Sequence, residues 1–256
     1  MKKLLLFTIL VIILSPVRAG YNSEARKIFE ESRQKMTLRN VSMVLDLVSA
    51  DRHGNTKTRT LAVTIAELGS RKKVLIEFTA PESVRGTKIV TTYDTTRKGI
   101  IEIYTPATGR IQKLRASRRN LEVMGSRIPI SRIGQTIDLN FNFSQLNTTQ
   151  VDGTRCYKIR LQKTGKKEYF IAYISTAKRY LLRLEKYDMN DQLTSVTVMS
   201  GYFPVNGAGS KVYPRHIIIR DLKTNEAITM NIHKAVVPER INPDVFTLSP
   251  ASTPKQ

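Results

Sequence analysis

The sequence is poor in cysteine, tryptophan and acidic residues: it has one cysteine, no tryptophan, and 21 Asp and Glu against 42 Lys and Arg. With Cys156 as the single cysteine, no disulfide can form within the chain, and a zinc site built from paired cysteines is excluded. Stability must therefore come from buried apolar surface, which 256 residues are enough to supply. We expect Cys156, in the strand-like run TRCYKIRL, to be a buried small side chain rather than a reactive thiol.

Motifs for catalysis and metal binding are also missing. The sequence has no G-x-S-x-G, H-E-x-x-H or C-x-x-C motif, and no two of its three histidines, His53, His216 and His233, stand at a ligand spacing. The segment NGAGSK has the glycines of a phosphate loop, but Ser210 precedes Lys211 where that motif needs Lys first. The sequence therefore predicts no catalytic residue, no metal and no cofactor.

The shortage of acids gives a formal net charge of +21 at pH 7, which favours anionic partners. One acid-free stretch is especially basic and contains Arg110, Lys113, Arg115, Arg118 and Arg119. Nucleic-acid surfaces interleave aromatic residues with cations, and Tyr104 is the one aromatic nearby, so we expect no nucleic acid as a partner. Two interpretations stay open: a loop that is merely solvated, or a basic surface that meets an anionic membrane surface or envelope transport proteins.

The first residues have the layout of a secretory signal peptide. Lys2 and Lys3 precede the apolar run Leu4–Leu14, and small or medium residues up to Ala19 then offer a cleavage site. A membrane-spanning helix needs about 20 apolar residues, so this run is too short to span. We therefore predict that residues 1–19 are cleaved and that the protein is exported to the periplasm of a Gram-negative type of envelope.

One amphipathic helix is predicted at the start of the exported chain, over residues 24–36. Ser23 can cap it, and Arg33 and Lys35 near its end suit the helix dipole. Its apolar residues form a narrow stripe: Ala25, Ile28, Phe29 and Met36. We expect this stripe to lie against another part of the protein.

After this helix, apolar residues recur at every second position, as in strands with one buried face. The alternation covers residues 41–48, 60–66 and 73–78 and is most regular in IDLNFNF, residues 137–143. Further strands are predicted at 88–93, 99–104, 110–115, 156–163, 168–174, 180–187, 193–199, 215–221 and 227–233, with turn-forming segments such as VDGT and KTGKK between them. The sequence thus predicts a mainly β protein with an antiparallel sheet, and a frayed tail at 249–256.

A large antiparallel sheet with one apolar face has to cover that face by curling, by packing on a second sheet or by accepting helices. Curled sheets of more than about eight strands enclose more space than their own side chains fill. Such a space suits an apolar ligand. The residues expected to line it, each of which ordinary core packing would also explain, are Leu61, Val63, Ile65, Val74, Ile76, Phe78, Leu139, Phe141 and Phe143.

Four stretches in chain order, residues 75–94, 101–126, 213–237 and 241–248, carry a recurring set of motifs. The motifs are F-x-x-P-x-x-x-R-G-T, then Y-x-P followed by an arginine, then M-G-S. They are filled here by Phe78, Pro81, Arg85, Gly86, Thr87, Tyr104, Pro106, Arg115, Met124, Gly125 and Ser126. In these stretches the sequence resembles the outer-membrane lipoprotein-sorting family, the LolA/LolB-like proteins, in its larger bacterial branch.

The resemblance implies an unclosed, strongly curved antiparallel β-barrel over residues 20–248, with the N-terminal helix and short helices plugging the concave face. It also implies that the hollow binds lipid or lipoprotein acyl chains and carries them across the periplasm without catalysis. The arginine that holds the lid of this family closed has no position matched by these motifs. Two alternatives remain: an envelope structural or regulatory module that docks a membrane transporter or sensor, and a lipid-cleaving enzyme on the same fold.

Overall fold

The computed structural model of the chain describes residues 23–93, 99–115, 121–123, 126–128 and 141–249. The predicted signal peptide and most of the predicted tail lie outside these ranges, as do Arg118, Arg119 and Leu139. Of the helices within these ranges, none is long and apolar enough to cross a membrane.

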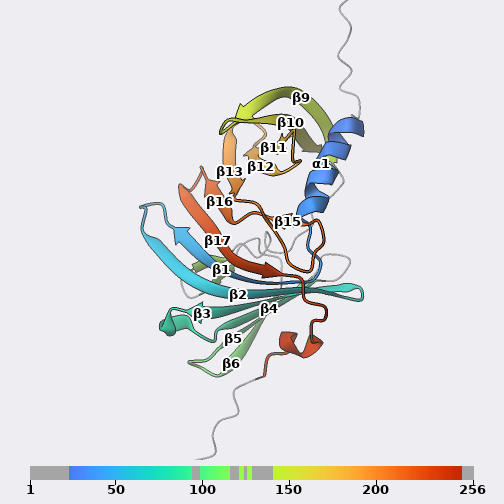
Figure 1. Cartoon of the computed structure of the whole chain (residues 1–256). Coiled ribbons are helices and arrows are strands. Elements are labelled where there is room, and N and C mark those ends of the chain that lie inside the picture. Colours follow the sequence, from blue (N-terminus) through green and yellow to red (C-terminus); the bar gives the residue numbers. More distant parts are fainter. Residues whose placement is uncertain (1–22, 94–98, 116–120, 124–125, 129–140, 250–256) are drawn as a thin grey trace, which may run out of the picture.

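Thirteen strands form one antiparallel sheet in which most neighbours in space are also neighbours in sequence (Figure 1). From the centre to one edge run β1 (Val41–Ala50), β2 (Thr56–Leu68), β3 (Arg71–Ala80), β4 (Lys88–Tyr93), β5 (Gly99–Thr105) and β6 (Arg110–Arg115). From the centre to the other edge run β17 (Glu226–Val236), β16 (His216–Asp221), β13 (Leu193–Ser200), β12 (Leu181–Tyr187), β11 (Tyr169–Ser175), β10 (Thr154–Lys163) and β9 (Phe141–Val151). The two halves join where β1 pairs with β17, with Leu45 opposite Ile232.

The remaining elements are short apart from one helix. That helix, α1 (Ser23–Met36), precedes β1. Two short hairpins accompany the sheet: β7 (Leu121–Val123) with β8 (Ser126–Ile128), and β14 (Phe203–Pro204) with β15 (Val212–Tyr213) between β13 and β16. Two 3-10 turns, η1 (Glu82–Val84) and η2 (Pro243–Phe246), complete the described fold.

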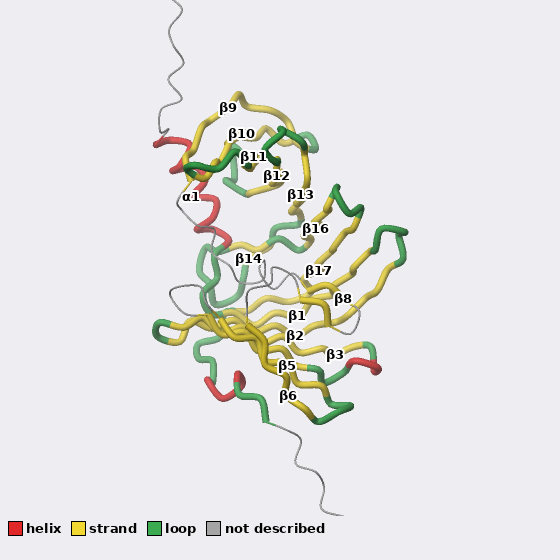
Figure 2. The backbone as a smooth tube through the Cα atoms, turned by 180° about the vertical axis from the view of Figure 1, so that it is seen from behind, coloured by secondary structure: helices red, strands yellow, loops and turns green. Residues whose placement is uncertain are grey.

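The sheet is strongly curved and is not closed into a barrel. Its edge strands, β6 and β9, stand at opposite ends of the strand order. Figures 1 and 2 show β2–β6 as one layer and β9–β13 curling round at the other end, where α1 lies beside them. The unclosed antiparallel sheet and the single N-terminal helix predicted from the sequence are therefore confirmed.

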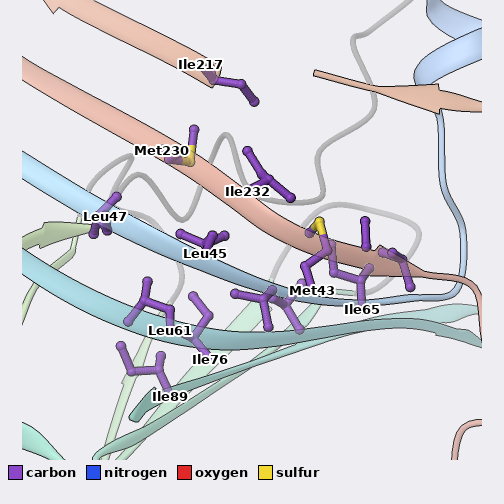
Figure 3. Close-up of a cluster of buried hydrophobic side chains, with 14 of the residues drawn as sticks. Met43, Leu45, Leu47, Leu61, Ile65, Ile76, Ile89, Ile217, Met230 and Ile232 are labelled. Carbon is purple, nitrogen blue, oxygen red and sulfur yellow. The ribbon is translucent and has the colours of Figure 1, made fainter. Parts of the chain in front are cut away.

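The main buried cluster comes from alternate residues of the β1–β5 half together with β16 and β17 (Figure 3). We call it the sheet cluster; its best-buried members include Met43, Leu45, Leu47, Leu61, Val63, Ile76, Phe78, Ile89, Ile101 and Ile232. Cross-strand pairing brings its members together, since Leu61 lies opposite Phe78 and Val63 opposite Ile76. We call the face that carries this cluster the inner face.

Part of the outer face of the same half is covered by the end of the described chain. Leu75 and Val90, which alternate with inner-face residues, pack with Ala66 against Phe246 of η2. The side chain of Asn242 caps η2 by accepting a hydrogen bond from the backbone N–H of Asp244 at 3.0 Å. The short helix η2 therefore lies on the outer face of β2–β4 rather than in the concavity.

Most predicted strands are found within a residue or two, and β9 is the instructive exception. The regular alternation predicted a strand over 137–143, whereas β9 spans Phe141–Val151, and residues 137–140 lie outside the described ranges. Its second part, from Ser144 onward, is polar and mostly exposed. An edge strand beside solvent does not need an apolar alternation, which is why the sequence pattern did not reveal this part.

Candidate functional site

The eight predicted lining residues that the structure describes lie on the inner face, but they fall into two clusters. Six of them belong to the sheet cluster: Leu61, Val63, Ile65, Val74, Ile76 and Phe78. Figure 3 shows Leu61, Ile65 and Ile76 pointing from β2 and β3 into that cluster. Their exposed fractions are between 0% and 3%, because other side chains of the protein pack on them.

The other two described lining residues, Phe141 and Phe143, lie at the β9 end of the sheet. Phe143 belongs to a second buried cluster, which we call the helix cluster, and Phe141 packs against it. The members of this cluster come from α1 and β9–β12: Ala25, Ile28, Phe29, Phe143, Ile159, Leu161, Ala172, Ile174 and Leu181. The predicted apolar stripe of the helix is thus found, and it covers this end of the inner face.

One arginine ties α1 to the sheet. Arg179, in the turn between β11 and β12, donates from Nε to Glu31 Oε2 of α1 at 3.2 Å. Its guanidinium lies 4.6 Å from the centre of the Tyr157 ring and also donates to the backbone carbonyl of Thr176 at 2.7 Å. Arg179 has a φ of 59°, in the left-handed region that few residues other than glycine adopt.

Further polar contacts hold the C-terminal half of α1. Lys35 Nζ donates to the carbonyl of Lys178 at 2.9 Å, and Lys211 Nζ donates to the carbonyl of Gln34 at 2.6 Å. These two bonds join the last turn of the helix to the β11–β12 turn and to the β14–β15 hairpin. Cations also interact favourably with the negative C-terminal end of the helix dipole.

A buried tyrosine supports the end of the helix. The hydroxyl of Tyr202 donates to the carbonyl of Leu181 and lies 3.2 Å from the sulfur of Met36, the last residue of α1. The Tyr202 ring stacks on that of Tyr180 at 4.4 Å between centroids. Burial raises the pKa of Tyr202 far above that of an exposed tyrosine, so this hydroxyl stays protonated and keeps its donor role.

The solvent side of α1 has a different character. An open pocket of about 340 Å³ lies along it, lined by Ser23, Arg26, Lys27, Glu30, Glu31 and Gln34. The residues that line it are polar or charged, and Arg26 and Glu30, one helical turn apart, form an ion pair at 2.7 Å. None of the residues that the sequence predicted to line an apolar hollow lines this pocket.

The predicted basic residues do not form one surface in the described chain. Arg110, Lys113 and Arg115 lie on β6, the edge strand, and all three are exposed. Lys113 lies opposite Glu102 and donates to it at 2.9 Å on the outer face, whereas Leu114 packs against the sheet cluster. Because faces alternate along a strand, Lys113 and Arg115 share the outer face and Arg110 lies on the inner one.

Two of the recurring motifs meet in space. Gly86, in the turn from β3 to β4, has a φ of 78°, and a Cβ there would lie 3.2 Å from Cγ of Pro106 in the β5–β6 turn. Two backbone hydrogen bonds between the first and the last residues of the same motif close this turn. Gly86 N–H donates to the Phe78 carbonyl at 2.8 Å, and Phe78 N–H donates to the Thr87 carbonyl at 2.9 Å. These motif residues therefore build the turn that joins β3 and β4.

The hydrogen-bond partners of the three histidine rings are a carboxylate, an amide and an arginine, not a hydroxyl or thiol that could act as a nucleophile. His233 Nε2 is 2.8 Å from Asp46 Oδ2, His216 Nδ1 is 2.9 Å from Asn231 Oδ1, and His53 accepts from Arg52 at 3.0 Å. Cys156 is buried, as expected, and burial raises the pKa of its thiol. Among the described residues, no group of three or more His, Cys, Asp or Glu could hold a metal ion.

Two residues with several polar contacts, Arg179 and the buried carboxylate Glu185, were not predicted from the sequence. Glu185 accepts hydrogen bonds from the hydroxyls of Tyr173 and Tyr187, both at 2.9 Å, and from Arg183 at 2.8 Å. A signal for Glu185 was present, because alternation on β12 places it on one face with Arg183 and Tyr187. Nothing in the sequence separates Arg179 from the many other cations, because its role depends on a turn that brings it to a distant helix.

Comparison with known proteins gives a family and a fold. A family model described only as "uncharacterized protein" matches residues 70–250. No curated protein sequence matches the chain. Within the matched range lie eleven of the thirteen strands of the sheet, all except β1 and β2.

Three solved structures have similar folds. An outer-membrane lipoprotein-sorting protein domain from Vibrio parahaemolyticus is 17% identical, with a TM-score of 0.70 over 87% of this chain and 96% of that one. A DUF1329 family protein from Desulfovibrio piger is 15% identical, with a TM-score of 0.72 over 88% and 96%. A LolA superfamily protein from Nitrosomonas europaea is 15% identical, with a TM-score of 0.58 over 88% and 97%. The resemblance seen in the sequence is thus confirmed at the level of the fold.

Proposed function

Because the chain belongs to the family of uncharacterized proteins whose model spans residues 70–250, and because it has the fold of outer-membrane lipoprotein-sorting domains, we propose that it is a periplasmic carrier of acyl chains. The cargo would be a lipid or the acyl chains of a lipoprotein, held without catalysis. The observation that supports this most directly is α1, whose apolar stripe covers the helix cluster at the β9 end of the inner face.

In this proposal α1 is a lid. The helix cluster is continuous with the sheet, and α1 supplies three of its buried members, Ala25, Ile28 and Phe29. An acyl chain that enters beneath the helix would replace these side chains with its own methylenes. Each buried methylene contributes about 0.8 kcal/mol, so a chain of about 14 carbons gives on the order of 10 kcal/mol before the costs of association and of moving α1.

The contacts that hold the lid are partly exposed and replaceable. The side chains of Arg179 and Glu31 are 26% and 40% exposed, and ion pairs of this kind contribute at most about 1 kcal/mol. Helix displacement would thus mainly exchange one set of apolar contacts for another. This balance suits a carrier that must release its cargo as well as bind it.

The partners follow from the same proposal. The donor or acceptor is an anionic membrane surface or an envelope transport protein, since the chain has a net charge of +21. Export by the predicted signal peptide, residues 1–19, would deliver the protein to the periplasm. Lys113 and Arg115, the exposed cations on the outer face of β6, would form one of the surfaces that meet such partners.

A second function is supported by the packing of the sheet cluster. Six of the predicted lining residues are at most 3% exposed, with side chains of the protein itself on them. A structural or regulatory module of the envelope, whose concave face is filled by its own side chains, would show this packing. In that case the protein would dock a membrane transporter or sensor and bind no lipid.

Uptake of a fluorescent fatty acid tests the proposal. We expect saturable binding by the purified protein, and faster uptake by Glu31→Gln, which removes the ion pair to Arg179. Lys27→Gln, on the exposed side of α1, serves as the matched control and should leave the rate unchanged. If neither the wild-type protein nor Glu31→Gln takes up the probe, the carrier is rejected in favour of the module.

A further inference from the structure

The two edges of the sheet differ in charge. The edge strand β6 has three cations, Arg110, Lys113 and Arg115, among its residues. The opposite edge strand, β9, has the sequence FNFSQLNTTQV and no charged residue. Charged side chains on an edge strand hinder pairing with another chain, so β6 is protected in a way that β9 is not.

The backbone of β9 is paired on one side. It pairs with β10 from Phe141 opposite Lys163 to Val151 opposite Thr154. In the described part of the chain, β9 is the last strand of the sheet order, so its other side offers unpaired N–H and C=O groups. Such a row of groups is a template for one more antiparallel strand.

Five of the six side chains in the first part of β9, Phe141–Leu146, are at least partly exposed, and Phe143 is the buried one. A bulge between Leu146 and Thr149 interrupts the register with β10, so the regular stretch is Phe141–Leu146. Phe143 faces inward, where it packs under α1. Ser144 and Leu146 lie on the other face, and Leu146 is 38% exposed.

We propose that β9 is a dimerisation edge that pairs antiparallel with β9 of a second copy of this chain. Copies with a net charge of +21 repel one another, so an association between them is favoured where neither surface carries charge. Two identical antiparallel strands are related by a two-fold axis, and such a contact closes on itself. The charged β6 edges then remain at the two ends of the joined sheet and oppose further growth into a filament.

This dimer extends the sheet without involving the inner face, so it does not depend on the proposed carriage of acyl chains. The residues of the outer face, Asn142, Ser144 and Leu146, would lie beside the same residues of the second copy. Leu146 would gain the apolar cover that it lacks in the single chain.

The mass in solution is the first test, measured by sedimentation and light scattering across a dilution series. We expect a concentration-dependent rise to twice the mass of one chain, and a tighter dimer on going from about 0.15 M to about 1 M salt, because salt screens the repulsion between the cationic copies. A single-chain mass at every concentration and at both salt levels overturns the proposal.

Edge-charge variants identify the surface. The double variant Ser144→Lys, Leu146→Lys should raise the dissociation constant of the dimer by at least about tenfold. Gln112→Lys places a charge on the opposite edge, β6, and should leave the dimer intact. Circular dichroism and thermal unfolding confirm that each variant is folded, and a folded double variant that dimerises as well as the wild type overturns the proposal.

Cysteine crosslinking gives a second readout that does not depend on affinity. Cα atoms of directly paired antiparallel residues lie about 4.5–5.5 Å apart, within the range that a disulfide spans. Among Asn142→Cys, Ser144→Cys and Leu146→Cys, tested one at a time, the variant nearest the two-fold axis should form a disulfide-linked dimer in mild oxidant. Cys156 is buried and should not crosslink. No crosslink at any of the three, or an equal crosslink from Gln112→Cys on β6, contradicts the β9 interface.

Discussion

The ring of Phe29 on α1 lies 5.5 Å from the ring of Phe143 on β9, with the two ring planes at 44°. Both side chains are at most 2% exposed. This tilted aromatic pair joins the helix to the edge strand of the sheet, and it lies in the middle of the helix cluster. The packing of α1 therefore depends on apolar contacts at this pair more than on the polar contacts at its end.

Replacing Phe29 tests whether this aromatic pair packs α1 on the sheet. Phe29→Ala removes a buried aromatic side chain and leaves a cavity, and such substitutions lower the free energy of unfolding by about 3–5 kcal/mol. Urea denaturation should show this loss, while Lys27→Ala, on the exposed side of the same helix, should change stability by less than about 0.5 kcal/mol. Equal effects of the two substitutions would mean that α1 is not packed as described.

The ion pair between Arg179 and Glu31 should contribute little to stability but should affect the opening of α1. A double-mutant cycle with Glu31→Gln and Arg179→Gln should give a coupling energy below about 1 kcal/mol, because both side chains are partly exposed. Amide hydrogen exchange within α1 should nevertheless become faster in either variant, while exchange in β1 and β2 stays unchanged. A uniform increase across the whole protein would show that the pair stabilises the fold rather than the position of the helix.

Two glycines of the β14–β15 loop provide a matched pair of substitutions. Gly207 and Gly209 have φ angles of 78° and 60°, so alanine is strained at both positions. A Cβ on Gly207 would also lie 2.1 Å from the carbonyl oxygen of Val237, whereas a Cβ on Gly209 meets nothing within 4 Å. Gly209→Ala should therefore cost about 1–2 kcal/mol of unfolding free energy, and Gly207→Ala clearly more. Comparable losses would contradict the close contact with Val237.

The tyrosines around Glu185 predict a loss of stability at high pH. Burial, together with the hydrogen bond to Glu185, raises the pKa of Tyr187 to about 12, above its ordinary value near 10. The folded state thus holds this proton more tightly than the unfolded state. The contribution is complete below about pH 10 and is lost as the pH rises from 10 through about 12.

Unfolding measurements between pH 9 and about 12 check this prediction. The free energy of unfolding should fall less steeply with pH in Tyr187→Phe than in the wild type. Tyr173→Phe should change the slope in the same direction, since burial and Glu185 raise the pKa of Tyr173 as well. Identical slopes in all three proteins would show that these hydroxyls are not held by Glu185 in solution.

The sequence was sufficient for elements whose pattern is local. Alternation along β1, β2 and β3 marks their inner-face residues, and the apolar stripe Ala25, Ile28 and Phe29 marks the buried side of α1, because burial on one face requires a fixed period. The turn between β9 and β10 was likewise indicated by its segment VDGT, in which Gly153 has a φ of 75°. These features give the unclosed sheet and the helix that covers part of it.

Features that depend on distant contacts could not be predicted in this way. Arg179 reaches Glu31 because a turn brings it to a helix at the other end of the chain. The separation of the lining residues into two clusters depends on where the sheet bends, which alternation does not encode. The pairing of β6 with β5 places the described cations of the basic stretch on both faces of the sheet. Side chains alternate between the two faces along a strand whether they are charged or apolar.

Native mass spectrometry of the protein purified from the cell envelope under mild conditions tests the carrier most directly. We expect a second species heavier than the bare chain by the mass of one lipid or acylated component, and a larger bound fraction in Glu31→Gln than in Lys27→Gln. Detection of the bare chain alone, in both variants and after incubation with an excess of phospholipid, would show that the protein is not a carrier of acyl chains.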